Sequence, residues 1–434
     1  MIDWNLLDND AQSNALMRPA MQDNESLRVT VKSILDDVAA RGDEAILSLT
    51  QQFDGASLES LTLDPALINT AESELSDSTK CAINTAYQNI KRFHEAQLPQ
   101  SVVIDTMPGV TCEQHAVALE KVGLYIPGGT APLPSTVLML GTPAQVAGCE
   151  TAILCTPPNE KGEIAAEIRY AASLCGINQV FLCGGAQAIA GMAFGTQSIP
   201  KVDKIYGPGN SFVTEAKQQV STRPDGAAID MPAGPSEVLV LADESANPVF
   251  VAADLLSQAE HGKDSQAILV SNSRTLIDQV IQQVDAQLEQ LSRNEIATAA
   301  MQHGRYILTS DFAQAVQVSN QYAPEHLIVQ AENARQWLGK IKHAGSIFVG
   351  RWSPESAGDY ASGTNHVLPT YGYSRMYSSL GLLDFMRRFT VQELSQSGFE
   401  ALAPTLLSLS SAEGLDAHGK AVSLRLAAIE EASS

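Results

Sequence analysis

Basic residues are scarce in this chain. Its 434 residues include 27 Lys and Arg against 49 Asp and Glu, for a formal net charge of -22. Binding to nucleic acid or to an anionic membrane surface would require clustered Lys and Arg. The composition therefore argues against both kinds of partner, and the acidity is best explained as an aid to solubility.

Long apolar runs are also missing. No uninterrupted apolar stretch is long enough to cross a bilayer, and the first residues, Met1 to Trp4, do not begin a basic segment followed by an apolar one. We expect no membrane segment and a cytoplasmic location. With 44% hydrophobic residues, the chain can bury a large core and should divide into at least two domains.

Cysteine pairs are absent. The six cysteines form no Cys-x-x-Cys motif and no regular framework, and most lie in apolar patterns where free cysteine acts as a small hydrophobic residue. Cys112 and Cys149 remain open as thiol nucleophiles, but neither has a motif of its own. A thiol mechanism is the less favoured alternative.

The usual nucleotide fingerprints are absent as well. Neither Gly-x-Gly-x-x-Gly nor Gly-x-x-x-x-Gly-Lys-Ser/Thr occurs. Instead, glycine-rich turns follow three predicted strands, at 125–129, 184–187 and 207–211. Glycine between a parallel strand and a helix lets backbone N–H groups approach a ligand at the helix N-terminus. Three such turns within one hundred residues indicate a ligand site.

Short β-branched runs alternate with amphipathic helical patterns through the middle of the chain. This rhythm predicts an α/β fold with two parallel-sheet (Rossmann-like) domains and small N-terminal and helical C-terminal appendages. The predicted strands are 122–126, 151–155, 179–183, 202–206, 236–241, 267–270, 305–308 and 346–349. The expected domains are an N-terminal appendage, 1–22; a larger discontinuous α/β domain, 23–129 with 237–381; a second α/β domain, 130–236; and a helical segment, 382–434.

Four of the eight histidines lie in short polar segments rich in metal and acid/base ligands. Buried charge is costly unless it is paired or bound to a metal, so these segments are interpreted as one site. Gln258 and His261, three residues apart at a helix end, would project from one face. Asp359 and His418 would complete a nitrogen and oxygen shell of the kind that zinc accepts. The segments are 258–262, 322–327, 356–366 and 413–418.

Three runs of sequence resemble histidinol dehydrogenase. They are Tyr322-Ala-Pro-Glu-His-Leu327, Ser353 to Tyr373, and Asp230-Met-Pro-Ala-Gly-Pro-Ser-Glu-Val238. The resemblance extends from about Val122 to the C-terminus, with a longer surface loop near 159–163. It implies a zinc-containing, NAD-dependent enzyme that oxidises L-histidinol to L-histidine through the aldehyde, reducing two NAD in sequence.

The resemblance also implies roles for single residues. It makes 130–236 the NAD-binding α/β domain and assigns the NAD contacts to Tyr125, Gln187 and Asn210. It implies one zinc per subunit, held by Gln258, His261, Asp359 and His418, and a homodimer in which segment 382–434 of one chain completes the site of the other. The residues assigned to the substrate are Ser236, Gln258, His261, His326, Asp359, His366, Glu413 and His418.

The implied chemistry suits Glu325 and His326. A neutral histidine near pH 7 can take the hydroxyl proton, so His326 is the predicted acid/base, and Glu325 is predicted to activate the water that adds to the aldehyde. The metal would orient the substrate through its imidazole and amine.

Two other functions stay open. A zinc hydrolase would use the same Glu-His pair and metal, although the sequence lacks His-Glu-x-x-His, and a non-catalytic protein would only bind a small polar ligand. Plainer roles also stay open for three residues: His366 would satisfy loop carbonyls, Glu355 would cap a turn, and Glu237 would be structural.

Overall fold

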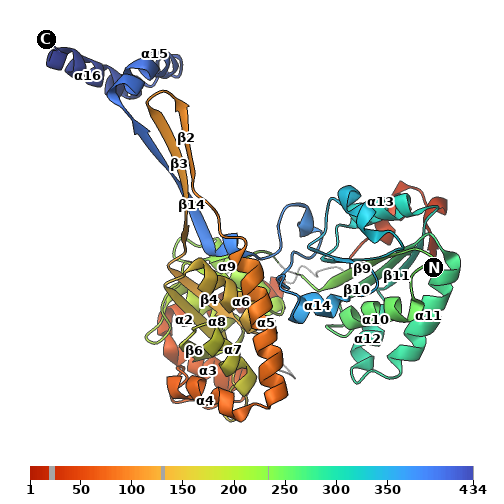
Figure 1. Cartoon of the computed structure of the whole chain (residues 1–434). Helices are drawn as coiled ribbons and strands as arrows, with labels where there is room; N and C mark the ends of the chain where they lie inside the picture. Colours follow the sequence, from red (N-terminus) through yellow and green to blue (C-terminus); the bar gives the residue numbers. More distant parts are fainter. Residues whose placement is uncertain (19–24, 129–131, 233, 434) are drawn as a thin grey trace. The chain divides into compact units, whose positions relative to one another are not determined.

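The computed structural model describes residues 1–18, 25–128, 132–232 and 234–433 (Figure 1). The chain forms two compact units. Unit 1 comprises Met1–Gln97 and Leu119–Phe385, and unit 2 comprises Leu98–Ala118 and Met386–Ser434. The predicted boundaries at 22/23 and 129/130 lie outside the described residues.

The first sheet of unit 1, sheet A, is parallel throughout, in the order β1-β11-β10-β9-β12-β13. Its central strands β10, β9 and β12 are fully buried and mainly apolar, as a sheet covered on both faces requires. The strands are β1 (Ile2–Asp3), β9 (Glu237–Ala242), β10 (Gln266–Ser271), β11 (Arg305–Leu308), β12 (His326–Gln330) and β13 (Ser346–Val349).

Alternate residues of sheet A enter two different cores. Val238 and Val240 pack with α10 and α11 on one face, whereas Leu239 and Leu241 pack with α13 and Trp4 on the other. The surrounding helices are η1 (Trp4–Leu6), α1 (Asn9–Ala15), α10 (Pro248–Ala259), α11 (Arg274–Leu288), α12 (Asn294–Met301), α13 (Phe312–Tyr322), η2 (Ala334–Lys340) and α14 (Glu355–Tyr360).

The second sheet of unit 1, sheet B, is also parallel, in the order β6-β5-β4-β7-β8. The strands are β4 (Lys121–Tyr125), β5 (Thr151–Thr156), β6 (Gln179–Leu182), β7 (Lys204–Tyr206) and β8 (Ala228–Ile229). The helices of this part are α2 (Glu25–Arg41), α3 (Asp43–Asp54), α4 (Pro65–Glu74), α5 (Asp77–Glu95), α6 (Pro134–Ala147), α7 (Ala166–Leu174), α8 (Gly185–Phe194) and α9 (Ser211–Ser221).

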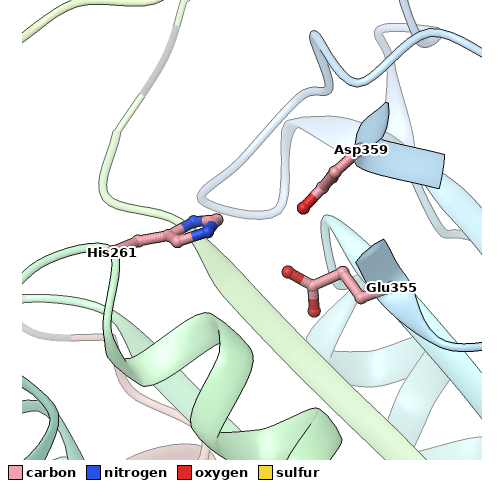
Figure 2. A group of neighbouring side chains, drawn as sticks. All are labelled: His261, Glu355 and Asp359. Atoms are coloured by element: carbon pink, nitrogen blue, oxygen red, sulfur yellow. The ribbon is translucent and has the colours of Figure 1, made fainter. Parts of the chain in front are cut away.

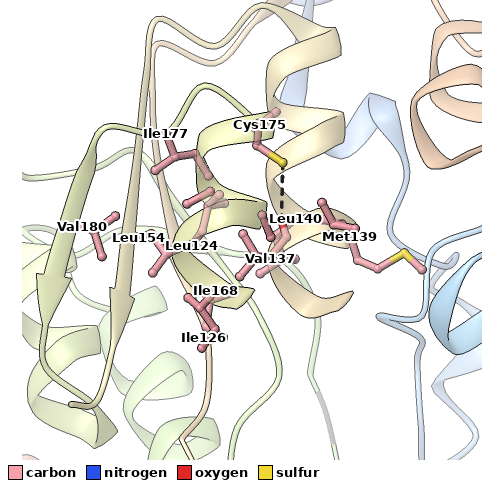
Figure 3. Close-up of a cluster of buried hydrophobic side chains, with 14 of the residues drawn as sticks. Leu124, Ile126, Val137, Met139, Leu140, Leu154, Ile168, Cys175, Ile177 and Val180 are labelled. Carbon is pink, nitrogen blue, oxygen red and sulfur yellow. Dashed lines mark hydrogen bonds between the residues drawn. The ribbon is translucent and has the colours of Figure 1, made fainter. Parts of the chain in front are cut away.

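Sheet B is likewise sandwiched between two cores. Leu124 and Leu154 pack against α5, α6 and α7 on one face, in the cluster that Figure 3 shows. Tyr125 and Ile153 pack against α2, α8 and α9 on the other. The segment after α14 returns to sheet B through η3 (Tyr373–Arg375) and η4 (Leu382–Phe385), where the Phe385 ring stacks on Tyr206 at 4.1 Å.

Unit 2 contains an antiparallel sheet, sheet C, in the order β14-β3-β2, followed by two helices. Every residue of β14 pairs with β3, from Met386 opposite Ala118 to Leu394 opposite Val110. The elements are β2 (Val102–Met107), β3 (Val110–Ala118), β14 (Met386–Leu394), α15 (Gln396–Ala412) and α16 (Asp416–Ser433).

The fold class predicted from sequence is confirmed, and all eight predicted strands are present. Segment 382–434 contains the helices α15 and α16, which strand β14 precedes. The apolar faces of the helices of 25–95 pack with sheet B, and β1 pairs with β11. The predicted domain boundaries stay predictions.

No helix within the described residues combines the length and the apolar character that a membrane span requires.

Candidate functional site

Glu325 and His326 lie where β12 begins, and both are buried. Backbone groups of Glu237, at the start of β9, hold both side chains. The Glu237 N–H donates to Glu325 Oε2 at 2.8 Å, and the Glu237 carbonyl lies 3.2 Å from His326 Nδ1. Parallel pairing of β12 with β9 therefore orients the pair predicted to be catalytic.

The partner of Nδ1 determines which ring nitrogen of His326 can accept a proton. A carbonyl only accepts hydrogen bonds, so Nδ1 carries the hydrogen and, in the neutral ring, Nε2 carries the free electron pair. Nε2 is buried without a hydrogen-bond partner among the described residues, and Asp359 Oδ1 lies 3.7 Å away. Burial lowers the pKa of His326 to about 3, which keeps the ring neutral at pH 7.

Arg18 fixes the position of Glu237, whose backbone contacts Glu325 and His326. Its guanidinium forms an ion pair with the Glu237 carboxylate at 2.8 Å and donates to the Tyr322 carbonyl at 2.9 Å. The structural role expected for Glu237 agrees with this pairing. Burial nevertheless raises the pKa of Glu237, against the effect of Arg18.

Gln258 and His261 meet at the end of α10. Asn247 caps the first turn of this helix and Pro248 begins it, so the chain enters the helix in a fixed direction. Gln258 lies in the last turn, fully buried, and its Nε2 lies 3.1 Å from His261 Nδ1. The two side chains converge as the three-residue spacing predicted.

Helix α14 brings two carboxyl groups to His261. Ligand atoms of His261, Glu355 and Asp359 all lie within 4.8 Å of one another, and Figure 2 shows the three side chains pointing toward a common space. Burial raises the pKa of Asp359 to about 6, and it raises the pKa of Glu355 well above its ordinary value. His261 is an exposed residue, but desolvation of its ring by the surrounding groups lowers its pKa.

His366 is tied to the same helix. Its Nδ1 lies 2.9 Å from the Asp359 carbonyl, so by the same reasoning its Nε2 has the free electron pair. Burial lowers its pKa to about 4. The carbonyl that His366 contacts belongs to helix α14 and not to a loop, and this contact leaves one ring nitrogen available.

These side chains gather at the amino-terminal edge of sheet A. Ser236 directly precedes β9, His326 begins β12, and α10 runs back so that its end reaches the same edge. Ligands of parallel sheets usually collect at the carboxyl edge. In this protein the candidate site lies at the amino edge instead, because α10 ends there and α14 brings Glu355 and Asp359 close to His261.

The donor set suits a divalent cation. Gln258 Oε1, both Glu355 oxygens and His326 Nε2 are buried without hydrogen-bond partners among the described residues. Amide and carboxylate oxygens with one imidazole form a shell that zinc and similar ions accept. Burial is the main cause of the raised pKa values of Glu325 and Glu355, and repulsion by neighbouring carboxylates adds to it. A bound cation would offset this negative charge.

Glu413 and His418 belong to unit 2. Glu413 follows the last turn of α15 and His418 lies in the first turn of α16, and both are exposed. Their predicted roles stay predictions.

The three residues that the resemblance assigns to NAD line one cavity of about 860 Å³ at the carboxyl edge of sheet B. Tyr125 ends β4, Gln187 lies in the first turn of α8, and Asn210 caps α9. Asp54 from α3 also lines the cavity, with one carboxylate oxygen buried and unpaired within the described part of the chain. The volume falls in the range of small-molecule and cofactor sites.

The glycine turns permit close backbone approach at this edge. Gly207, at a φ of 124°, has no room for a side chain, since a Cβ atom would lie 2.1 Å from the Tyr125 carbonyl oxygen. The Tyr125 hydroxyl accepts a hydrogen bond from the Gly185 N–H at 3.0 Å. Gly129 of the first predicted turn lies outside the described residues.

The structure gives no support to Cys149 as a nucleophile. Burial raises the pKa of its thiol to about 11, which disfavours the reactive thiolate at neutral pH. Cys112 lies in β3 of unit 2.

Sequence reasoning missed the position of Glu355. It was expected to cap a turn, but neither of its oxygens bonds to a backbone N–H in the described part of the chain, and Pro354 occupies the cap position of α14. Its four-residue spacing from Asp359 on a short helix was the available signal.

Comparisons with known proteins agree over nearly the whole chain. The sequence model of the family described as histidinol dehydrogenase matches residues 17–426. The chain is 57% identical over 431 residues to histidinol dehydrogenase of Escherichia coli and 56% identical over 426 residues to that of Colwellia psychrerythraea, covering 98% or more of each. The crystal structure of histidinol dehydrogenase from Elizabethkingia anophelis superposes with a TM-score of 0.94 at 47% identity, covering 98% of this chain and 97% of that one.

Proposed function

Because the chain belongs to the histidinol dehydrogenase family, we propose that it oxidises L-histidinol to L-histidine through L-histidinaldehyde, with reduction of two NAD. The reaction would complete histidine biosynthesis. The observation that carries the proposal is the free Nε2 of His326, buried beside the Asp359 carboxylate in a chain so similar to enzymes of that name.

Gln258, His261 and Asp359, with His418, would hold one zinc ion per subunit. When bound, the ion would orient the imidazole and amine of the substrate so that its carbinol carbon faces the reacting groups. The convergence of Gln258 and His261 and the unpaired Gln258 oxygen support this assignment.

The cavity at the carboxyl edge of sheet B would hold NAD, which supplies the hydride acceptor for both oxidations. Tyr125, Gln187 and Asn210 line it, together with Gly128 and Gly185 of the glycine turns, where backbone N–H groups would approach the ligand.

In the first oxidation, His326 Nε2 would take the hydroxyl proton of the substrate, while Nδ1 keeps its hydrogen bond to the Glu237 carbonyl. Glu325 would then accept a proton from the water that adds to the aldehyde carbon. Its raised pKa makes it a stronger base than an exposed carboxylate. His326 would take the proton of the resulting hydrate in the second oxidation. Ser236 and His366, both at this edge, and Glu413 would contact polar groups of the substrate.

We also propose that the enzyme is a homodimer in which Glu413 and His418 act on the partner's site. Both residues are exposed in unit 2, as groups that act on another chain would be.

The direct test is to supply L-histidinol and NAD and record nicotinamide reduction. Two NADH per histidine are expected, with loss of turnover on chelation and recovery on adding zinc. The His326→Asn enzyme is the inactive control. Ester or amide cleavage without NADH would favour a zinc hydrolase, and ligand binding without either reaction would favour a binding protein.

A further inference from the structure

The turn that leads into η3 has a backbone conformation that its sequence does not favour. The Tyr373 N–H donates to the Thr370 carbonyl at 2.9 Å, so Tyr371 and Gly372 are the two central residues of a tight turn. Both have a positive φ, of 55° and 75°. Such turns usually carry Asn-Gly, because asparagine and glycine adopt the left-handed conformation at little cost. A bulky aromatic residue in this place is costly, so contacts with other segments must stabilise the turn.

Tyr371 contacts the segment that leads into β9 at two points. Its N–H donates to Oε1 of Glu237, the first residue of that strand. Its ring covers the α-carbon of Gly234, where an added Cβ atom would lie 2.3 Å from Tyr371 Cδ2. The hydroxyl of the neighbouring Thr370 accepts a hydrogen bond from the Gly234 N–H at 2.6 Å. The turn therefore holds both ends of segment 234–237.

A second left-handed residue is linked to the same glutamate. Tyr371 and Ala323 are the non-glycine residues with a positive φ in the described part of the chain. The Ala323 carbonyl accepts a hydrogen bond from Arg18 at 3.3 Å, and Arg18 forms the ion pair with Glu237. Costly backbone conformations persist only where the surrounding structure fixes them, and they cluster at active sites. Here both are linked to Glu237, whose backbone holds the Glu-His pair.

We propose that Tyr371 is a positioning residue for the reaction proposed above, on which this inference rests. Tyr371 fixes segment 234–237, so that the Glu237 backbone keeps its contacts with Glu325 and His326. The ring is the essential part. Glycine in this place would supply the same N–H at a lower conformational cost, but it would lack the contact over Gly234. The cost of the left-handed backbone is then the cost of placing this ring beside the segment.

The test compares stability with turnover in Tyr371→Gly, using the full-length enzyme supplied with zinc, L-histidinol and NAD. Glycine removes the left-handed cost and the ring together, so the thermal midpoint should stay within about 4 °C of wild type. In contrast, kcat should fall at least about 10-fold, because the reacting groups lose their alignment. KM for NAD should stay unchanged, since Tyr371 is not among the described residues that line the proposed NAD cavity.

Three further variants separate the ring from the backbone. Tyr371→Phe keeps the ring and should keep nearly the turnover of wild type. Tyr371→Asn adopts the left-handed conformation readily but has no ring, and it should lose as much kcat as Tyr371→Gly. Tyr377→Gly is the matched control, because it removes an exposed ring six residues farther along the chain, and it should behave as wild type.

Amide hydrogen exchange provides a readout that does not depend on turnover. Peptides that contain Gly234 and Glu237 should exchange faster in Tyr371→Gly than in wild type, because both N–H groups lie in the segment that the ring holds. Peptides from β5 of sheet B should exchange at the same rate in both proteins.

The outcomes separate this inference from the proposed function. If Tyr371→Gly or Tyr371→Asn kept wild-type kcat, the ring would position nothing and the inference would be wrong. A folded Tyr371→Gly with a much lower thermal midpoint and unchanged kcat would show a structural role alone and would also contradict it. If Tyr371→Gly did not fold, Tyr371→Asn with the turnover of Tyr371→Phe would refute the inference. If the wild-type enzyme produced no NADH from L-histidinol, the proposed function itself would be wrong.

Discussion

Replacing Asp359 by Asn should stabilise the metal-free enzyme at neutral pH while it removes a proposed metal ligand. The Asp359 side chain is only 18% exposed, and burial raises its pKa to about 6 from an ordinary 3.8. The folded protein therefore holds this proton more tightly than the unfolded chain does. Ionisation then favours unfolding.

The pH window follows from those two pKa values. Below pH 3.8 the group is protonated in both states and contributes nothing. Between pH 3.8 and about 6 the destabilisation grows, and above that it stays constant at about 3 kcal/mol, since each pH unit between the two values corresponds to about 1.4 kcal/mol. Asparagine has nearly the same shape and no charge, so the variant escapes this cost.

Urea unfolding of chelator-treated wild type and Asp359→Asn, followed from pH 4 to pH 8, measures the difference. The curves should differ by less than about 1 kcal/mol near pH 4 and separate by up to about 3 kcal/mol above pH 6.5, with the variant more stable. The exposed Asp278→Asn on α11 is the control and should follow wild type. A difference that did not depend on pH, or a less stable variant at pH 7.5, would refute the reasoning.

Three further outcomes are expected. Glu325→Gln should slow oxidation of supplied histidinaldehyde more than the alcohol step, whereas His326→Asn should slow both; equal losses for Glu325→Gln would contradict its role. Mixing the inactive double variant Glu325→Gln/His326→Asn with inactive His418→Asn should regenerate NADH production, because one site of the mixed dimer carries neither defect; no recovery despite measured subunit exchange would argue for a site within one chain. Arg18→Met should lower the free energy of unfolding by about 3 to 5 kcal/mol, because the buried Glu237 carboxylate then lacks its cationic partner. The double variant Arg18→Met/Glu237→Gln should regain part of the lost free energy of unfolding, as measured by chemical denaturation.

The parallel sheets were predictable because the sequence of each strand alone identifies it as a strand. A buried parallel strand is a short continuous β-branched run between helical patterns, and β9 and β10 fit that description. Strand β12 was missed although its Leu327-Ile-Val329 run has the same character, because its first residue belongs to the Glu-His motif and drew a functional interpretation.

Sheet C could not be predicted in the same way. Strand β14 is exposed along almost its whole length, so it shows no contrast between a buried and a polar face. What stabilises it is pairing with β3, far away in the sequence. Local patterns do not reveal such long-range pairing.

Only part of the candidate site could be predicted from the sequence as well. The ligand types and their spacing were visible in sequence, so Gln258 and His261 could be paired in advance. Burial was not visible. The turn-capping role expected for Glu355 and the ion pair between Arg18 and Glu237 both depend on which side chains lose contact with water when distant elements pack.

The long separation between β3 and β14 has a consequence for synthesis on the ribosome. β3 is complete at Ala118, but its partner begins at Met386, about 270 residues later, which at roughly 5 to 20 residues per second is a delay on the order of 15 to 50 s. Throughout that time the β2–β3 hairpin has an open edge, and Val102, Val103 and Ile104 are exposed even in the finished unit. Nascent chains that meet during this interval could pair through those strands, so the yield of correctly folded enzyme should depend on keeping polysome-bound chains apart.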